Sequence, residues 1–461
     1  MQPFTKFASL ASAAALAACQ GRGVGAVPST AAQPLSAAQA SRAAVDWPQF
    51  RFDDDRTGVN PRENTLNSRN VSSLQLSWAA QLGELVDYSS PAVVNGVAYI
   101  GSRDGRLWAY SSNGCGQSLC SQPLWTSVSL GQIIDSPTVT KGRVYVGSQT
   151  SFSSNDGKLD VFSAAGCGQS ACAPIWQGLA GTDAILQSSP AVAKGRAFIG
   201  SHDGRLYVFD ADGCGGANTC VPLWTAATGG SIESTPTVDG NTVYVGSDDG
   251  NLYAFKARGC GSSTCKPLWV GHLGSAVFDS SPAISGKRVY IGSQHGVAAF
   301  NASGCGASTC QPLWQASNSS DFFNGSPAIY KGRIYIGDED GLAVYAAKGC
   351  GKATCKPLWL DFGVGFQAAV VSSPSIANGV VYAGRNTGEV LAWKAGPCGK
   401  FLCDNIWSGA TNDQIVSSSP TVVNGKVYIG SADNGSSSNI QGRLYVYALR
   451  ANSQAIRPIS R

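Results

Sequence analysis

Fourteen of the fifteen cysteines fall into seven pairs whose members are five or six positions apart. The phrase GCGQSLCSQPLW at residues 114–125 is typical, with a Trp a few positions after the second cysteine. Such spacing could serve a metal site, a thiol redox centre, a haem tether or a disulfide. The pairs are Cys115/Cys120, Cys167/Cys172, Cys214/Cys220, Cys260/Cys265, Cys305/Cys310, Cys350/Cys355 and Cys398/Cys403.

The surroundings of these pairs favour disulfides. Haem attachment needs Cys-x-x-Cys-His, thioredoxin-like chemistry needs Cys-x-x-Cys at a helix start, and neither occurs in the sequence. Pairs on separate, evenly spaced loops would not meet to form a four-cysteine zinc site. We therefore predict seven local disulfides, each on a loop at the edge of one repeated structural unit, or blade. Disulfides are typical of an oxidising compartment, and reduced thiols in a reducing compartment are the alternative.

A second set of residues could bind a ligand. Ser-Pro or Thr-Pro steps recur along the chain, and the third residue before several of these prolines is polar. Carboxylate and amide oxygens are the ligands that Ca²⁺ prefers, although a solvated polar rim would have the same composition. The candidate binding residues are Gln187, Glu233, Asp279 and Asn324 at that position, with Asp87 and Asp135 one residue away from it.

The repeat that carries these residues predicts the fold. The marking prolines are 45 to 53 residues apart, at Pro91, Pro137, Pro190, Pro236, Pro282, Pro327, Pro374 and Pro420. Each unit, such as residues 89–125, divides into four short strands separated by turns that often contain Asn-Gly or Asp-Gly. Four antiparallel strands at this period are typical of propeller blades. The predicted fold class is therefore all-β, an eight-bladed β-propeller.

The last unit lacks its outer strand. Seven units end in a Trp-containing strand, whereas the eighth stops after residues 443–449. The stretch LQLSW, which ends in Trp78, has the missing pattern and precedes the first unit. We predict that residues 74–80 complete the last blade and close the ring, which removes an exposed edge. The Trp of each unit is expected to pack between neighbouring blades.

The N-terminal residues have the pattern of a targeting segment. Lys6 precedes a small-residue apolar run that is too short to span a bilayer, and it ends in Leu-Ala-Ala-Cys, which resembles a bacterial lipobox. We predict a signal peptide over residues 1–18, lipidation of Cys19 and a flexible linker to residue 45. Secretion with cleavage near Ala18 is the alternative. The propeller is predicted over residues 46–450, followed by a C-terminal tail at 451–461.

Two longer patterns resemble a known superfamily. SSPAV…VYIGS.DG.LYAF…PLW is similar to the repeat of the pyrroloquinoline-quinone-like (PQQ-like) eight-bladed propellers. DWPQFRFDDDRTGVNP, at residues 46–61, resembles the N-terminal segment of many secreted bacterial members. The superfamily contains quinoprotein dehydrogenases and also non-catalytic scaffolds, one of which is the lipoprotein subunit of the outer-membrane barrel-assembly machinery. For the dehydrogenases, the resemblance implies PQQ and calcium held by acidic and amide groups.

Other features of the sequence favour a scaffold. No adjacent Cys-Cys pair and no haem motif occurs, and about 46 residues per blade leave little room for a substrate lid. His202 and His295 fall in turns after the second strand of their units, where surface residues are expected, and His272 is the third histidine. The net charge is +4 and no basic run occurs, so we expect no nucleic-acid partner.

We therefore predict a non-catalytic, extracytoplasmic binding or scaffold module, anchored to the cell envelope by lipid alone. Its partner would be a protein or another envelope component, and no cofactor is predicted. One alternative is a quinoprotein dehydrogenase that uses PQQ and calcium to oxidise alcohols, sugars or polyvinyl alcohol. Another is an extracellular binder of carbohydrate or other ligands.

Overall fold

The computed structural model describes residues 45–151, 156–181, 183–185, 187–316, 325–339, 341–362, 369–411, 413–432 and 441–450. The predicted signal peptide, the lipidation site Cys19, nearly all of the linker and the C-terminal tail lie outside the described residues. So does the candidate ligand residue Asn324. No helix among the described residues is long and apolar enough to cross a bilayer.

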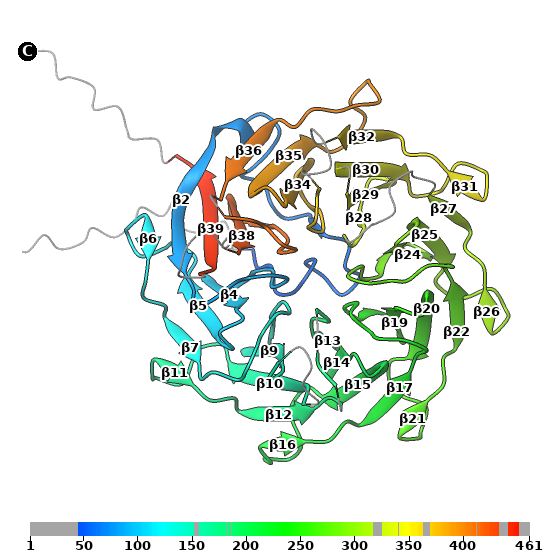
Figure 1. The fold of residues 1–461 in the computed structure, drawn as a ribbon, viewed down its shortest axis with the longest axis horizontal. Coiled ribbons are helices and arrows are strands. Elements are labelled where there is room, and N and C mark those ends of the chain that lie inside the picture. Colours follow the sequence, from blue (N-terminus) through cyan, green and yellow to red (C-terminus); the bar gives the residue numbers. More distant parts are fainter. Residues whose placement is uncertain are drawn as a thin grey trace, which may run out of the picture. The chain divides into compact units, whose positions relative to one another are not determined.

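Eight sheets surround a central axis, one for each marking proline, which confirms the eight-bladed propeller (Figure 1). In blades 1 to 7 the strands run antiparallel from the centre outward in chain order. Blades 1 to 4 consist of β3(Ala92–Val94), β4(Val97–Gly101), β5(Leu107–Ser111), β7(Trp125–Ser127); β8(Thr138–Thr140), β9(Arg143–Ser148), β10(Lys158–Ser163), β12(Trp176–Leu179); β13(Ala191–Ala193), β14(Arg196–Gly200), β15(Arg205–Asp210), β17(Trp224–Ala227); and β18(Thr237–Asp239), β19(Thr242–Ser247), β20(Asn251–Lys256), β22(Trp269–His272).

Blades 5 to 8 follow the same plan, except that the outer strand of blade 8 comes from the N-terminal part of the chain. They consist of β23(Ala283–Ser285), β24(Arg288–Ser293), β25(Gly296–Asn301), β27(Trp314–Ala316); β28(Ala328–Tyr330), β29(Arg333–Asp338), β30(Gly341–Ala346), β32(Trp359–Phe362); β33(Ser375–Ala377), β34(Val380–Arg385), β35(Glu389–Lys394), β36(Trp407–Ala410); and β37(Thr421–Val423), β38(Lys426–Ser431), β39(Arg443–Leu449), β2(Leu74–Gln81).

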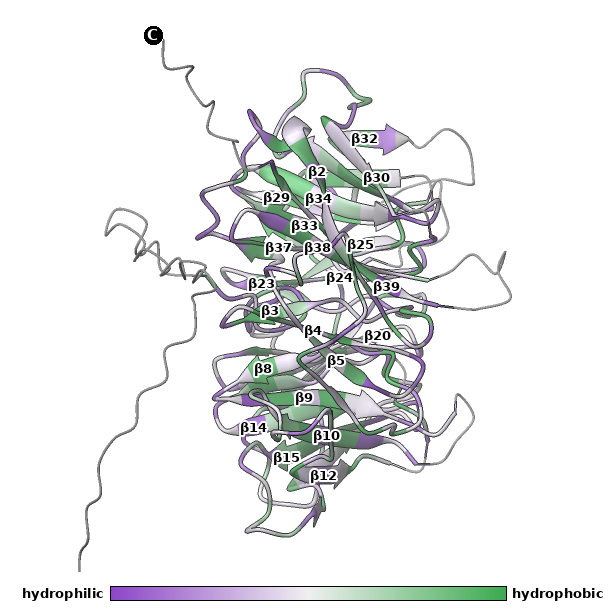
Figure 2. Cartoon of the chain, turned by 90° about the vertical axis from the view of Figure 1, so that its left-hand side faces the viewer, coloured by the Kyte–Doolittle hydropathy of each residue, from purple (hydrophilic) through white to green (hydrophobic). Residues whose placement is uncertain are grey.

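The strands form where the sequence alternates and end where the turn chemistry requires it. Asn95 and Gly96, between β3 and β4, have φ angles of 50° and 76°. Two successive left-handed residues are the conformation of a type I′ hairpin turn, for which Asn-Gly is the preferred sequence. Figure 2 shows hydrophobic residues concentrated on the strands and hydrophilic residues on many of the connections between them. The blades therefore bury their strand residues against one another.

Each outer-strand Trp packs between neighbouring blades, as predicted. Trp176 of blade 2 lies 6.5 Å from the ring of Phe209 in blade 3, measured between ring centroids. The same arrangement recurs between Trp125 and Phe162, at 6.3 Å. Aromatic pairs at such distances add to the free energy gained by burying their area. The repeated Trp is therefore a core residue of the ring.

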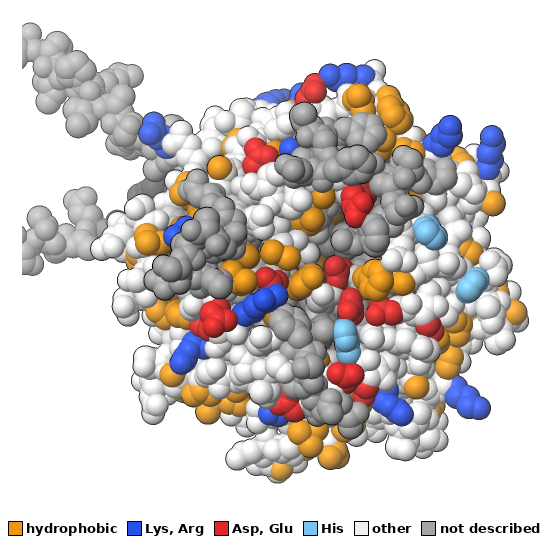
Figure 3. All heavy atoms as spheres, in the orientation of Figure 1, with side chains coloured by type: hydrophobic (Ala, Val, Ile, Leu, Met, Phe, Trp, Pro, Cys, Tyr) orange, Lys and Arg blue, Asp and Glu red, His pale blue; other side chains and the backbone are white. Residues whose placement is uncertain are grey.

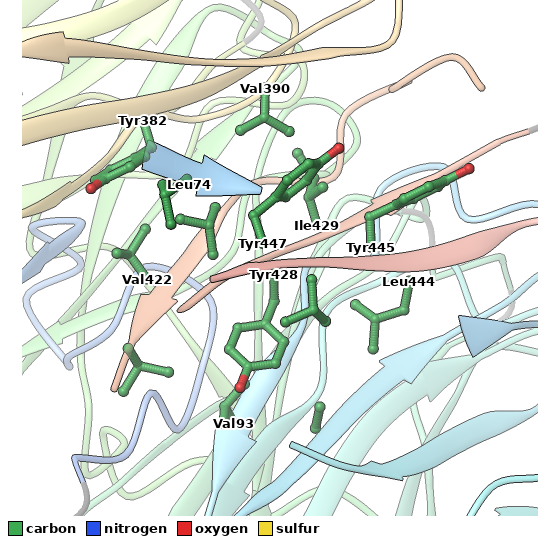
Figure 4. Packing of buried hydrophobic residues seen from close by; sticks show 14 of the residues in the cluster. Leu74, Val93, Tyr382, Val390, Val422, Tyr428, Ile429, Leu444, Tyr445 and Tyr447 are labelled. Atoms are coloured by element: carbon green, nitrogen blue, oxygen red, sulfur yellow. The ribbon is translucent and has the colours of Figure 1, made fainter. Parts of the chain in front are cut away.

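The N-terminal strand closes the ring. Strand β2 pairs antiparallel with β39 from Leu74, opposite Leu449, to Gln81, opposite Arg443. This confirms the predicted closing strand, which extends one residue further than expected. Figure 4 shows the core at the closure, where Leu74 from β2 packs with Tyr447 from β39 and with residues of blade 7 such as Val390.

All seven predicted cysteine pairs form disulfides. Six of the closed loops contain a two-residue strand, and each such strand pairs parallel with the outer strand of the preceding blade. The seventh loop makes an isolated bridge of the same kind, between Leu402 and Leu360. The disulfide hairpins therefore join adjacent blades as well as closing their own loops. Their strands are β6(Leu119–Cys120), β11(Ala171–Cys172), β16(Thr219–Cys220), β21(Thr264–Cys265), β26(Thr309–Cys310) and β31(Thr354–Cys355).

The disulfides lie on the predicted loops at the blade edges, and the second cysteine of every pair is buried. Cys403 of the seventh pair is only 4% exposed and belongs to the same hydrophobic cluster as Trp359 of the preceding blade. Its N–H also donates to the carbonyl of Leu360 at 2.9 Å. The second half of each loop is thus held against the neighbouring blade, and its sulfur contributes to the core. These buried cysteines are Cys120, Cys172, Cys220, Cys265, Cys310, Cys355 and Cys403.

Candidate functional site

A closed ring of hydroxyl groups surrounds the central channel. The residue before each marking proline donates its backbone N–H to the side-chain hydroxyl of the equivalent residue in the next blade, at 2.8 to 3.1 Å. The eighth bond runs from Ser419 to Ser90 and joins the last blade to the first. The repeated Ser-Pro or Thr-Pro step is therefore the innermost contact between blades. Its members are Ser90, Ser136, Ser189, Thr235, Ser281, Ser326, Ser373 and Ser419.

Residues 45–60, which we call the strap, cross one mouth of this channel and are seen in dark blue at the centre of Figure 1. The strap carries β1(Val59–Asn60), which pairs parallel with β33. Its backbone carbonyls accept hydrogen bonds from the innermost strands of several blades, for example from Val139 to Pro48 and from Ile284 to Asp55. The strap lies on the side of the turns between first and second strands, because Asp46 accepts from the N–H of Asn95.

Two buried arginines of the strap complete a second set of hydrogen bonds. In blades 2, 4, 7 and 8 the residue after the marking proline is Thr or Ser, and its hydroxyl donates to the proline carbonyl of the next blade. In the other four blades this residue is Ala. Arg56 Nε donates to Pro236 at 2.7 Å, and Arg51 donates to Pro327 at 2.5 Å and to Pro374 at 3.4 Å. In four blades the proline carbonyl receives no hydroxyl hydrogen bond, because the preceding blade has alanine at the donor position. The two arginines donate to three of these four carbonyls.

The strap holds an unfavourable backbone conformation in order to make these contacts. Arg51, Phe52 and Arg56 have φ angles of 63°, 79° and 51°, a region that residues other than glycine rarely occupy. Burial lowers the pKa of Arg51 to about 9 and that of Arg56 to about 10, so both side chains stay protonated at neutral pH. Strained residues persist only where the surrounding contacts hold them, and here the hydrogen bonds to the blades do so.

The strap also fills the channel. Phe50 lines a cavity of about 30 Å³ together with hydroxyl-ring residues and with Tyr88, Gln187 and Asp279 from the opposite mouth. A space of this size holds one or two water molecules. The strap therefore lies at one mouth of the channel, and polar side chains line the other.

Those polar side chains include three of the predicted ligand residues. With its amide oriented to suit its neighbours, Gln187 donates to Asp279 and, at 3.0 Å, to Glu233, and it accepts from the Tyr88 hydroxyl at 3.1 Å. Gln187, Glu233 and Asp279 come from loops of blades 3, 4 and 5, and Tyr88 from blade 1. The structure thus brings residues that are far apart in the sequence to one mouth of the channel. Together with His202 and Asp248, we call these residues the acidic mouth.

His202 and Asp248 were not predicted as site residues, although both contribute to this cluster. His202 Nε2 lies 2.7 Å from Glu233 Oε1. Both residues occupy the turn after the second strand of their blade, and their backbone N–H groups bond to the carbonyls of Ala184 and Ser231 in the loop that enters the blade. That shared position in the repeat was the available signal, since it places both side chains beside the predicted ring.

Burial and charge crowding shift the proton affinity of the acidic mouth. Burial, together with the charges of Glu233 and Asp248, raises the pKa of Asp279 well above its usual value. Burial and Glu233 raise the pKa of Asp248 to about 7. Burial would lower the pKa of His202, but its hydrogen bond to Glu233 outweighs this and raises it. Figure 3 shows acidic side chains and a histidine gathered near the centre of this face.

Two other predicted residues, Asp87 and Asp135, make contacts with their own blades. Asp87 forms an ion pair with Arg103 on blade 1. Asp135 is buried within blade 2, where it accepts a hydrogen bond from the N–H of Gly147 at 2.6 Å. Seryl hydroxyls make the equivalent bond in other blades, for instance Ser188 to Gly200. Asp135 therefore takes the place of a structural serine.

The binding of PQQ with calcium stays an alternative that rests on the resemblance alone, and Asn324, one of its predicted ligands, lies outside the described residues. Among the described residues, no group of three or more His, Cys, Asp or Glu side chains is placed to hold a metal ion.

Comparison with known proteins identifies the family of this chain. One family profile, described as outer membrane protein assembly factor BamB, matches residues 57–214 and 173–395. The chain belongs to this family. The BamB family has the PQQ-like eight-bladed fold, which confirms the resemblance found in the sequence. No curated protein matches the chain significantly in sequence.

Solved structures of both functional classes share the fold of this BamB family member. BamB from Moraxella catarrhalis superposes with a TM-score of 0.59 and 16% identity, covering 82% of this chain and 98% of that one. Quinohemoprotein alcohol dehydrogenase from Comamonas testosteroni gives a TM-score of 0.64 and 15% identity, covering 90% and 82%. A europium-containing methanol dehydrogenase gives 0.63 and 13%, covering 88% and 98%. At these identities the likeness establishes the fold alone.

Proposed function

We propose that this protein is a non-catalytic scaffold of the bacterial cell envelope that takes part in outer-membrane protein assembly. The strap carries the proposal: residues 45–60 cross one mouth of the channel, and Phe50 lines the small cavity between the two mouths. The family description supports the same function. Because the strap occupies one mouth of the channel, we infer that the opposite, acidic mouth acts as a surface for a protein partner.

The seven disulfides support a place outside the cytoplasm, because such bonds persist in oxidising compartments. We propose that Cys19 carries the lipid that anchors the protein. Replacing it, as Cys19→Ser, should release the protein from the membrane fraction of cells. An unchanged distribution between membrane and soluble fractions would contradict the anchor.

The partner surface can be tested by site-specific photocrosslinking in cells. A photoreactive amino acid in place of Asp248, at the acidic mouth, should crosslink the protein to a component of the outer-membrane assembly machinery. The matched control is the same amino acid in place of Lys287, an exposed turn residue between β23 and β24 on the strap side. Equal crosslinking from both positions, or none from Asp248, would contradict the assigned face.

The dehydrogenase alternative has its own test. Purified protein mixed with PQQ and Ca²⁺ should show no bound-quinone absorbance and no dye-linked oxidation of alcohols. Activity that is lost in the Glu233→Ala variant would overturn the scaffold proposal.

A further inference from the structure

The outer edges of the blades are covered in a regular way. In seven blades, the N–H of the residue that follows the outer-strand Trp donates to a backbone carbonyl in the disulfide loop of the next blade, at 2.8 to 2.9 Å. An unpaired strand edge attracts other strands, so this repeated bond protects each blade. The donors are Ala79, Thr126, Gln177, Thr225, Val270, Gln315 and Leu360.

Blade 7 lacks this cover. Its equivalent donor is Ser408 on β36, and no described backbone segment pairs with the outer edge of that strand. Blade 8 has no disulfide loop, because its outer strand β2 arrives from the N-terminal side of the chain. In place of the loop stands a short 3-10 turn, η1(Val71–Ser73), followed by Leu74, whose carbonyl accepts from the Trp407 indole at 3.1 Å.

The exposure of blade 7 agrees with its open edge. Ser408 and Ala410 are exposed, whereas the seven covered donors are buried or half-buried. Trp407 itself remains buried, so the start of β36 is well packed. The open edge is therefore a short stretch of ordered backbone, whose outward N–H groups at Ser408 and Ala410 pair with no described segment.

We propose that the outer edge of β36 is a docking site for a short extended segment of a partner protein. The segment would add to blade 7 as the disulfide hairpins add to the other blades, by backbone pairing with an edge strand. This inference goes beyond the proposed function, because it concerns a different surface from the acidic mouth and does not depend on it.

The covered blades define the chemistry that fits. Each hairpin strand runs parallel to the strand it covers, and its first residue is Leu, Ala or, in four cases, Thr. The second residue is a cysteine that is buried in one cluster with the Trp of the covered blade, as Cys220 is with Trp176. The partner segment should therefore be extended, free of proline, and carry a small apolar second residue that reaches Trp407.

Parallel pairing also argues against a second copy of this chain as the occupant. A dimer with two-fold symmetry would place β36 against its own copy in antiparallel orientation. The hairpin strands instead pair in parallel in every described instance. A partner with a free extended segment meets this requirement without symmetry.

A hairpin of this chain supplies the probe for a binding test. A fluorescent, oxidised peptide of residues 303–313 (SGCGASTCQPL) carries the strand β26 that covers β22 in blade 4. It should bind the purified full chain saturably, and Ser408→Pro, which removes the outward N–H, should weaken binding about tenfold. Ser408→Ala, which keeps the N–H, should bind like the natural protein. A peptide carrying Thr309→Pro should not bind.

A second measurement covers the case in which Ser408→Pro does not fold. Ala410→Pro removes the other outward N–H, and hydrogen exchange of the Ser408 and Ala410 amides in the natural protein should slow when the peptide is added. Unchanged exchange and unchanged binding would overturn the proposal. Binding that occurs only after removal of residues 451–461 would show that the tail occupies the edge. A dimer that Ser408→Pro dissociates would assign the edge to a second copy. Either result also overturns it.

Discussion

Three residues of the acidic mouth, His202, Asp248 and Asp279, hold protons more tightly than isolated side chains do, because their pKa values are raised. Glu233 lies 2.7 Å from His202 and contacts Gln187, and its charge raises the proton affinity of Asp248 and Asp279. A partner that brings a positive group to this mouth would favour the ionised carboxylates, so binding and proton release would be coupled. The mouth is thus sensitive to pH in the range where Asp248 titrates.

Asp248 gives a prediction for stability. Its pKa is about 7 in the folded protein, compared with about 3.9 for an unperturbed Asp. The folded state binds this proton more tightly, so its contribution to stability is complete below about pH 4 and is lost as the pH rises to about 7. Asp248→Asn should therefore raise the melting temperature more at pH 8 than at pH 5. Calorimetry at both pH values checks this, and an equal shift at both would contradict it.

Prediction from the sequence reached only part of this cluster. Gln187, Glu233 and Asp279 could be predicted because they share one position in the repeat, and that position faces the mouth. Asp135 is one residue away, and in a strand-like segment this directs its side chain into the blade, toward Gly147. His202 and Asp248 share a position in the repeat, but they were missed because the direction of a turn residue also depends on the path of the neighbouring loop.

Among the elements, the strap and the disulfide hairpins join neighbouring blades. The strap supplies hydrogen-bond donors where the repeat has alanine, so its arginines and the residues after the marking prolines complement each other. The closing strand β2 could be predicted because Trp78 repeats the pattern of the other outer strands. The pairing of each hairpin with the preceding blade could not be predicted, because two residues with parallel partners leave no periodic signal. The burial of cysteines such as Cys403, which follows from that pairing, could not be predicted for the same reason.

The strap arginines can be tested by removal and replacement. Arg51→Ala leaves the carbonyls of Pro327 and Pro374 without a donor and should lower the free energy of unfolding by about 2–4 kcal/mol. Adding Ala283→Ser and Ala328→Ser restores hydroxyl donors of the kind seen at Ser375, and should recover part of that loss. Chemical denaturation measures both variants. No recovery in the combined variant would contradict the proposed complementarity.

Because each hairpin pairs with the preceding blade, we expect that removing one disulfide also destabilises that preceding blade. Replacing Cys214 and Cys220 by Ser should lower the free energy of unfolding by about 2 kcal/mol, the value expected for so short a loop. Amide exchange should accelerate at Gln177, which donates to the Asn218 carbonyl from blade 2. Mass spectrometry of exchanged peptides locates the change. Acceleration confined to blade 3 would show that the hairpin stabilises only its own loop.

At the scale of the whole ring, the hydroxyl contacts make the junction between the last and first blades equivalent to the others. The bond from Ser419 to Ser90 measures 2.8 Å, within the range of the seven bonds between consecutive blades. Figure 4 shows the hydrophobic packing at the same junction, which combines residues from both ends of the propeller. The overall fold was predictable because repeats and turns specify it locally, whereas the strap contacts join residues hundreds of positions apart.

This equivalence predicts equal costs for equal substitutions. Ser90→Ala removes the acceptor for Ser419 at the junction, and Ser281→Ala removes the acceptor for Thr235 within the chain. Each leaves one buried N–H without a partner and should cost about 1–3 kcal/mol. Thermal unfolding should remain a single transition in both variants. A much larger loss for Ser90→Ala would mean that the junction is the weak point of the ring.

The strap bears on how the number of repeats can change. Modular repeats lengthen and shorten easily when each unit touches only its neighbours. Here the backbone of one segment, the strap, bonds to inner strands of blades 1, 2, 4, 5, 6 and 7 in the order of the chain, from Trp47 at Val93 to Gly58 at Ile376, and the Asn60 side chain bonds to Val422 of blade 8. Duplicating or deleting a blade would shift every later contact out of register with a strap of fixed length. The length of the strap therefore fixes the number of blades at eight, while the sequences of the individual blades remain free to diverge.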